Sequence, residues 1–321
     1  YLKASSDGFY FAVKAENNWW GTQQGAFRMP TRGIVGNGNN SGNVSNYVDF
    51  SPWCSNATGS HCVATNNTNV GGGIHTTIQA AINNASIGDI IEVAGNYTEN
   101  IAINMSLTLK SLEGMAKSML TVGTITLSES ADNFILGGTS GNGFYMNAST
   151  ADLIKLTGFA TKSGPENVTI SFNTFNLTAN KRNAISLVGT NLSGLSVINN
   201  SFFFNGTDQV GVASDEGRDI YTLTVFDNTF RTTRPAASST RGVALSIPKF
   251  NNTVSNISRN YFYNMSVAVI IGNNSLNAGY KPGSSYLLIN SNTFAGSNIS
   301  LAILNVDSLT NTTYQDIRIT S

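Results

Sequence analysis

The chain has 321 residues, with 18 basic and 18 acidic side chains, and charged residues make up only 11% of it. Zero net charge and the lack of a basic stripe argue against a nucleic-acid-binding protein or a polybasic membrane-surface protein. The longest apolar runs, such as residues 267–271, are far too short to span a membrane as a helix. The length suits one long solenoid or two ordinary domains.

Residues 1–53 are predicted to be the closing coils and cap of a β-helix. Residues 9–13 have the composition of a strand, and residues 13–20 fit a phrase that recurs later in the chain. The segments NNWWG (17–21) and VDFSPW (48–53) resemble those that close the last coils in the pectin-lyase-like right-handed β-helix superfamily, as found in archaeal and bacterial cell-surface proteins. The resemblance implies that Trp19, Trp20 and Trp53 cover the open end of the core, although a sugar-binding platform is the alternative.

Residues 54–72 are predicted to be a polar linker rich in Asn, Thr and Gly. It contains Cys54 and Cys62, whose spacing in a secreted chain favours a local disulfide. A zinc site with His61 and His75 is the alternative, but the spacing matches no usual ligand pattern.

Residues 73–113 are predicted to open the main β-helix, which extends over 73–321. Thr76 as N-cap and Gln79 three residues later give the spacing of a capping box, for a short capping helix near 76–86. Strands are expected at 90–93, 101–103 and 107–109. The string TIQAAINNASIGDIIEVAGNYTENIAINMSLTLKSL resembles the opening of the same superfamily, in which a short helix plugs the first coil. The apolar face of the helix consists of Ile74, Ile78, Ala81, Ile82 and Ala85.

A recurring phrase defines the rest of the chain: apolar, any, apolar, any, any, Asn, any, aromatic. Its copies are residues 168–175 (VTISFNTF), 195–202 (LSVINNSF), 223–230 (LTVFDNTF), 255–262 (SNISRNYF) and 287–294 (LLINSNTF). The Asn positions are 27, 28, 32 and 32 residues apart. A fixed phrase at such intervals is typical of a solenoid whose units stack on their neighbours. Residues 142–144 form a weaker version of it.

The phrase predicts an all-β fold, a right-handed parallel β-helix with two or three short strands per coil. Its two apolar positions alternate as in a strand, and a second apolar run follows each copy, as at 184–188 and 243–247. The phenylalanines are expected to stack inside the following bend. A two-sheet antiparallel sandwich, the alternative, would show tight hairpin signals instead. The asparagines predicted to form a hydrogen-bonded ladder are Asn18, Asn173, Asn200, Asn228, Asn260 and Asn292.

Asparagine is unusually abundant, and 19 of the 42 asparagines lie in Asn-X-Ser/Thr sequons, about twice the chance number. The excess predicts an extracellular or cell-surface chain with N-linked glycans, although such triplets also suit β-helix turns. Asn199, taken as part of the ladder segment, is among the sequons expected to stay bare. The candidate attachment sites are Asn39, Asn43, Asn56, Asn66, Asn84, Asn96, Asn104, Asn147, Asn167, Asn176, Asn191, Asn199, Asn205, Asn251, Asn256, Asn264, Asn273, Asn298 and Asn311.

The closing coils come first in this chain, the opening helix follows, and the last coil has no capping motif. This order predicts a structural subunit of a filament, sheath or surface layer that assembles with itself, head to tail. The expected subunit junction involves Phe9, Phe11, Val13, Ile317 and Ile319. A period of a longer tandem-repeat protein is the competing account. With few titratable groups, the assembly should withstand a wide pH range.

A catalytic role is not expected, and neither is a cofactor. The alternative function is a polysaccharide-binding or lyase-like surface protein, because many relatives in the superfamily degrade polysaccharides. A weak calcium site could be formed by Asp215, Glu216 and Asp219. A wider carboxylate cluster would add Asp208 and Asp227, beside Arg218, Arg231 and Arg234. A sugar-binding aromatic row could be formed by Phe203, Phe204, Tyr261 and Tyr263.

Overall fold

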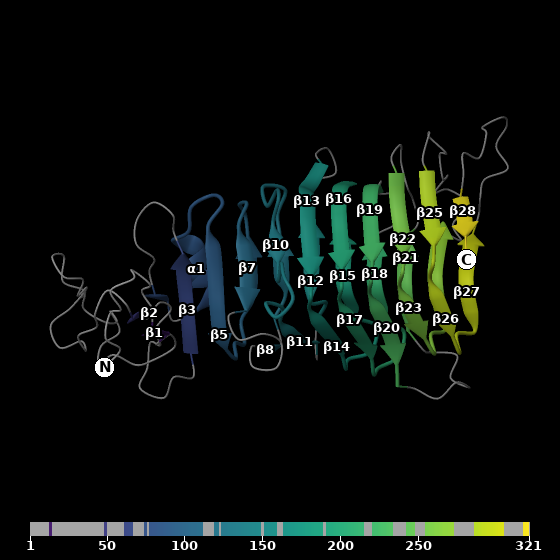
Figure 1. Ribbon diagram of the computed structural model, residues 1–321, viewed down its shortest axis with the longest axis horizontal. Coiled ribbons are helices and arrows are strands. Elements are labelled where there is room, and N and C mark those ends of the chain that lie inside the picture. The colour runs from purple at the N-terminus through teal and green to yellow at the C-terminus, as the bar shows by residue number, and fades with distance from the viewer. Residues whose placement is uncertain are drawn as a thin grey trace, which may run out of the picture.

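The computed structural model shows a parallel β-solenoid whose strands form three long sheets along one axis (Figure 1). It describes residues 13–14, 48–49, 61–66, 74–75, 77–111, 119–121, 123–148, 151–158, 163–188, 191–214, 220–233, 242–247, 254–272, 286–304 and 317–320. Triplets of strands recur along the chain, from β7–β8–β9 to β25–β26–β27, with one strand in each sheet. The predicted parallel β-helix is therefore confirmed, with three strands per coil.

The first sheet is the row of strands seen side by side in Figure 1. Its order, with β28 at one end and β4 at the other, is parallel except at β3 and β4. Its strands are β28 (Ile317–Thr320), β25 (Tyr286–Asn290), β22 (Val254–Ser258), β19 (Ile220–Phe226), β16 (Asn191–Ile198), β13 (Ser163–Ser171), β10 (Ile135–Leu136), β7 (Thr108–Ser111), β5 (Ile90–Gly95), β3 (His61–Asn66) and β4 (Ile74–His75).

The second and third sheets complete each coil. The second contains β26 (Thr293–Ala295), β23 (Tyr261–Tyr263), β20 (Thr229–Thr232), β17 (Ser201–Phe204), β14 (Thr174–Leu177), β11 (Tyr145–Ala148) and β8 (Met119–Thr121). The third contains β27 (Ile299–Leu304), β24 (Val267–Gly272), β21 (Val243–Ile247), β18 (Val210–Ser214), β15 (Asn183–Val188), β12 (Ile154–Thr157), β9 (Ile125–Leu127) and β6 (Ile101–Ile103). A separate parallel pair joins β1 (Val13–Lys14) to β2 (Val48–Asp49).

The core consists of apolar columns that run along the solenoid axis. One column pairs Ile170, Val197, Val225, Ile257 and Ile289 in register across consecutive coils. The parallel column of Val168, Leu195, Leu223 and Leu287 is interrupted by the buried Ser255, whose hydroxyl accepts a hydrogen bond from the Leu223 N–H at 3.1 Å. Inward residues alternate with outward ones on every strand, so each coil contributes one residue to each column.

The phenylalanines of the phrase stack as predicted, inside the second sheet. Neighbouring ring centroids from Phe175 to Phe294 lie 4.7, 4.5, 5.1 and 5.1 Å apart, with interplanar angles of 8° to 16°. These separations match the spacing of about 4.8 Å between parallel strands, so the rings follow the coil repeat. Offset aromatic stacking of this kind contributes packing energy beyond the burial of area.

The capping helix is shorter than predicted, and its N-cap differs. Helix α1 comprises Ile78–Asn83, and its N-cap is Thr77, whose hydroxyl accepts from the Ala80 N–H at 3.0 Å. The predicted N-cap, Thr76, was one residue too early. Thr76 and Thr77 are equally good caps by residue type, and only the packing of the helix decides at which of them it begins. The predicted apolar face is present, with Ile78, Ala81 and Ile82 buried and Ala85 packed against the core; the side chain of Ile74 lies outside the described residues.

Two other predictions differ from the structure. Residues 61–66, within the predicted linker, form β3, which pairs antiparallel with β5 because the first strand of the stack needs a partner at its outer edge. The weak phrase at 142–144 has its Asn at 142 and its aromatic residue at 144, but in the structure Phe144 is at the position of the ladder asparagine and Met146 is in register with Phe175. In the described part of the chain, no helix is long and apolar enough to cross a membrane.

Candidate functional site

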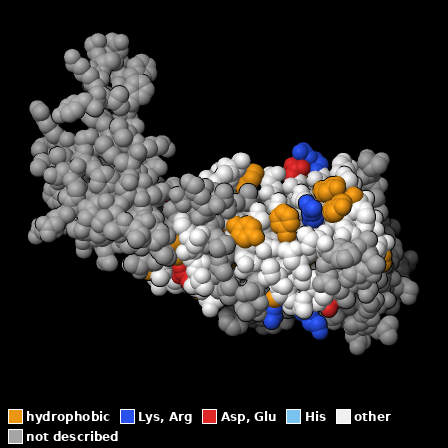
Figure 2. All heavy atoms as spheres, turned by 90° about the horizontal axis from the view of Figure 1, so that it is seen from below, with side chains coloured by type: hydrophobic (Ala, Val, Ile, Leu, Met, Phe, Trp, Pro, Cys, Tyr) orange, Lys and Arg blue, Asp and Glu red, His pale blue; other side chains and the backbone are white. Residues whose placement is uncertain are grey.

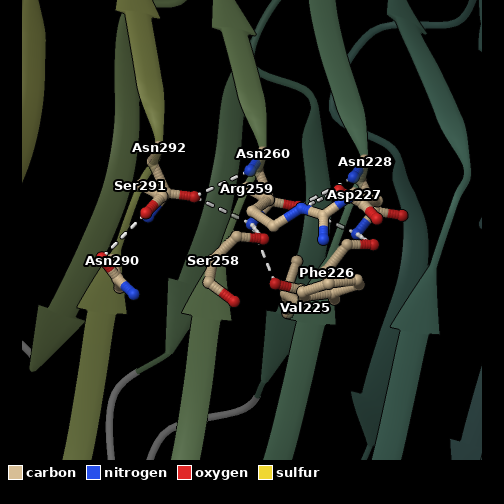
Figure 3. A network of polar contacts seen from close by, with 10 residues as sticks. All are labelled: Val225, Phe226, Asp227, Asn228, Ser258, Arg259, Asn260, Asn290, Ser291 and Asn292. Atoms are coloured by element: carbon tan, nitrogen blue, oxygen red, sulfur yellow. Dashed lines mark hydrogen bonds and ion pairs between the residues drawn. The ribbon is translucent and has the colours of Figure 1, made fainter. Parts of the chain in front are cut away.

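The corner between the first and second sheets carries a continuous asparagine ladder (Figure 3). The backbone N–H groups of Asn173, Asn200, Asn228 and Asn260 each donate to Oδ1 of the ladder asparagine in the next coil, at 2.9 Å. The Nδ2 group of each also donates to that oxygen, at 3.0 to 3.3 Å. The ladder ends at Phe144, whose backbone N–H donates to Oδ1 of Asn173 at 3.0 Å.

Each ladder side chain also satisfies backbone carbonyls within its own and the preceding coil. Nδ2 of Asn228 donates to the carbonyl of Val197 at 2.7 Å and to that of Phe226 at 3.0 Å. The amide therefore closes the two-residue corner and ties it to its neighbour. Asn18, the sixth predicted member, lies outside the described residues.

The residue before each ladder asparagine has left-handed backbone geometry. The φ angles are 52° to 58° at Phe172, Asn199, Asp227, Arg259 and Ser291. Two of these residues form an ion pair between coils, with Nε of Arg259 2.9 Å from Oδ1 of Asp227. The Arg259 guanidinium lies 4.7 Å from the ring centre of Phe226, which places both groups on the outside of this corner (Figure 3).

The stack is closed at the end that carries α1. Glu99 accepts hydrogen bonds from the N–H groups of Ile78 (2.8 Å) and Gln79 (3.1 Å), which would otherwise be unpaired at the helix start. The side-chain amide of Gln79 bonds both backbone groups of Ala102, in the terminal strand β6 of the third sheet. Side chains and antiparallel strands thus cover the edges of the first and third sheets here, in place of the reciprocal capping-box contact predicted for Gln79.

The opposite end has partly exposed core positions. Phe294 and Leu301 are half-buried, although their register partners one coil earlier, Phe262 and Val269, are fully buried. Ile299, on the same strand as Leu301, is 47% exposed, although it is not at a core position, since its register partner Val267 is itself half-buried. Where β28 lies over β25, by contrast, Leu287 and Ile289 stay buried. Among the described strands, nothing pairs with the outer edges of β26, β27 and β28.

The outer face of the second sheet carries the exposed aromatic residues. Tyr261 and Tyr263 are 40% and 39% exposed, and Phe203 is half-buried. Figure 2 shows hydrophobic side chains beside a basic one on the face that it presents, toward the end that carries β26. Phe204, the fourth candidate for this row, is fully buried, because it shares the inward side of β17 with Phe202.

The structure does not bring the described members of the proposed carboxylate cluster together. Asp208 is in the turn after β17, Asp227 is at the ladder corner, and Arg231 is on the outer face of β20. No group of three or more potential metal ligands occurs in the described part of the chain. Asp215, Glu216, Arg218, Asp219 and Arg234 lie outside the described residues, as do Cys54 and the side chains of Cys62 and His61.

Sequon asparagines and ladder asparagines form two separate groups. Each of the five described ladder residues is followed two positions later by Phe, so none is in a sequon. Every sequon asparagine with a described side chain is exposed or half-buried. Asn199, placed inside the ladder from the sequence, is instead an exposed residue beside the ladder member Asn200. Trp19, Trp20, Trp53, Phe9, Phe11 and the side chains of Val13, Ile317 and Ile319 lie outside the described residues.

Comparison with known proteins gives no relative: no protein-family model matches the chain, and neither a curated protein nor a solved structure is similar to it.

Proposed function

We propose that this chain is a structural subunit of an extracellular filament, sheath or surface layer that assembles by head-to-tail stacking of β-helices. The observation that supports this most directly is the difference between the two ends of the stack. One end is covered by α1, β3 and β4, whereas core side chains of β26 and β27 are partly exposed at the other. Unpaired strand edges above an apolar core are a template for further strands.

The contact that would complete the stack joins two different surfaces and does not close on itself. Such heterologous contacts produce linear assemblies. Phe294 and Leu301 would then become as buried as Phe262 and Val269 are one coil earlier. Residues 1–53 are the proposed source of the covering coil, in a second copy or in a neighbouring repeat of a longer protein. The parallel pairing of Val13 with Val48, 35 residues apart, is compatible with a coil in that segment.

N-glycosylation is the second part of the proposal. The separation of buried ladder asparagines from accessible sequon asparagines supports it, because glycans attached to the ladder would break the core. Mass spectrometry of the natively secreted protein, before and after enzymatic removal of N-glycans, tests this part independently of assembly.

Assembly is tested by light scattering and negative-stain electron microscopy of the purified chain over a range of concentrations. We expect filaments, and we expect Ile299→Lys to suppress them by placing a charge at the exposed end. Val188→Lys is the matched control, since Val188 is 39% exposed on a strand in the middle of the stack. A monodisperse monomer of the unsubstituted chain at all concentrations would refute the proposal.

A further inference from the structure

The outward-facing aromatic residues of the second sheet, two exposed and two half-buried, share one feature: each precedes a sequon asparagine by one to three residues. The pairs are Tyr145 with Asn147, Phe203 with Asn205, and Tyr261 and Tyr263 with Asn264. Residues two apart on a strand lie on the same side, so Tyr145 and Asn147 share the outer face. The buried phenylalanines of the same sheet pack in the core, which accounts for their presence, whereas the core does not account for the outward-facing rings.

The pair on β23 is the most developed of these sites. The rings of Tyr261 and Tyr263 are nearly parallel, at 14°, and their centroids are 6.1 Å apart. The Arg231 guanidinium lies 5.6 Å from the Tyr263 ring centre, on the strand before. In the next coil, the register partner of Tyr263 is the small Ala295. Tyr263 is therefore flanked by a cation on one strand and by little side-chain volume on the other.

The chemistry of this face matches that of a sugar. Among its described outward side chains, Arg231 is the only charged one, and the others are hydroxyl, amide or aromatic groups except the methyl group of Ala295. A pyranose ring presents an apolar C–H face that stacks on an aromatic ring, and hydroxyl groups that bond polar side chains. A face with a single charged group among hydroxyl, amide and aromatic groups complements an uncharged glycan.

A glycan attached to Asn264 needs little intrinsic affinity to occupy this face. Tyr261 is three residues away, which is at most about 10 Å of extended chain and within the reach of the first sugars. Covalent attachment gives the sugars a high effective concentration at the neighbouring rings. Asn264 itself is half-buried and has a left-handed φ of 57°, directly after the strand that carries both tyrosines.

We propose that the chain carries its own ligand here: the N-linked glycan of Asn264 lies across Tyr261 and Tyr263 and covers the outer face of β23. This inference rests on the N-glycosylation proposed above and adds the place where the sugars pack. The aromatic rings are then seats for glycans of the same molecule, not a site for a foreign polysaccharide.

Hydroxyl-radical footprinting of the glycosylated protein, read by mass spectrometry, tests the proposal. The comparison is between Ser266→Thr, which keeps the Asn264 sequon, and Ser266→Ala, which removes it. We expect Tyr261 and Tyr263 to be oxidised several-fold faster in Ser266→Ala. Tyr221, on the first sheet, is the internal control and should react equally in both variants.

Three results would overturn the proposal. One is equal oxidation of the two tyrosines in both variants when the mass shows a glycan on Asn264 of Ser266→Thr. Another is the absence of any glycan on Asn264 while other sequons are occupied, which leaves general N-glycosylation intact. The third is protection that appears only when cellohexaose is added, because the face would then bind external sugar.

Discussion

Oδ1 of Asn228 accepts two hydrogen bonds from Asn200, 2.9 Å from its backbone nitrogen and 3.1 Å from its Nδ2. One buried side chain thus satisfies two donors in the preceding coil. The same Asn228 residue donates in the same way to Asn260 in the next coil. The ladder therefore connects each coil to both of its neighbours.

Replacing Asn228 with Ala should lower the free energy of unfolding by about 3 kcal/mol, because several buried backbone groups lose their partner at once. They include the N–H of Asn200 and the carbonyls of Val197 and Phe226. Urea titration followed by circular dichroism measures the change. Asn104→Ala, at an exposed asparagine, is the control and should stay within about 0.5 kcal/mol of the unsubstituted chain. Equal effects of the two substitutions would mean that the ladder adds no stability.

The left-handed corner residue Asn199 should tolerate glycine but not valine. Its φ of 55° costs a residue with a Cβ about 1–2 kcal/mol, most of all a β-branched one, and costs glycine little. We expect Asn199→Val to destabilise the chain by about that amount and Asn199→Gly to leave it nearly unchanged. Ser196→Val, on the outer side of the same strand, controls for the exposed methyl groups. A loss in Ser196→Val as large as in Asn199→Val would contradict the backbone explanation.

Stability should decline modestly on both sides of a broad pH plateau. Burial lowers the pKa of His75 below its usual 6.5, so the unfolded chain binds a proton that the folded chain resists. Stability from this group is present above pH 6.5 and is lost as the pH falls below it. In His75→Gln, the free energy of unfolding should fall less between pH 6.5 and pH 4, as measured by unfolding curves recorded from pH 4 to pH 8. An unchanged dependence of this free energy on pH would exclude His75 as the cause.

At the alkaline side, burial raises the pKa of Tyr97, and the nearby Glu99 raises it further. A raised pKa means that stability is complete below the ordinary value of 10 and is lost as the pH rises above it. Tyr97→Phe should remove this alkaline decline in thermal scans between pH 9 and pH 11. A decline of the same size in the variant would point to other groups.

Three sequon asparagines in consecutive coils should not be equally glycosylated. Nδ2 of Asn176 donates to Oδ1 of Asn147 at 3.2 Å, and Asn176 accepts a hydrogen bond from Asn205 in turn. Since coils are about 4.8 Å apart, a glycan on Asn176 has a neighbour on either side. Asn205 is exposed and Asn176 is half-buried, so we expect lower occupancy at Asn176 in glycopeptide spectra. Thr207→Ala, which removes the Asn205 sequon, should raise the glycan occupancy of Asn176. An unchanged occupancy of Asn176 in this variant would exclude crowding by the neighbouring glycan as the cause.

The repeat was predictable because the same physical constraint acts once per coil. A corner of two residues needs a side chain that bonds carbonyls in two coils, and Asn meets that need in four copies, with a fifth Asn bonded to the preceding coil. Ser255 shows the limit of the pattern, since a polar residue in an apolar column is tolerated when its hydroxyl bonds the Leu223 backbone. The alignment of residues 255–262 with the other copies of the phrase was therefore correct, although Ser255 stands where the other copies have an apolar residue.

The closed end of the stack could not be predicted in the same way. Strand β3 has no repeat to identify it, and its role depends on the outer edge of β5 rather than on its own residues. The Glu99 contact with the start of α1 joins residues 21 positions apart that no local pattern links. The sides of Phe203 and Phe204, by contrast, follow from strand alternation: Phe202 was predicted to face the core, so Phe204 faces it too and Phe203 lies outside, and the expectation that Phe204 is exposed was wrong.

The distance from one ladder asparagine to the next varies between 27 and 32 residues, yet the corner that holds it is always two residues long. The additional residues therefore lie at the other corners, whereas the pitch of about 4.8 Å is set by the hydrogen-bonded pairing of strands in all three sheets. Foreign peptides grafted between the third and first sheets, for example between β24 and β25, should leave that pitch unaltered. The chain is thus a natural scaffold for displaying added segments at regular intervals.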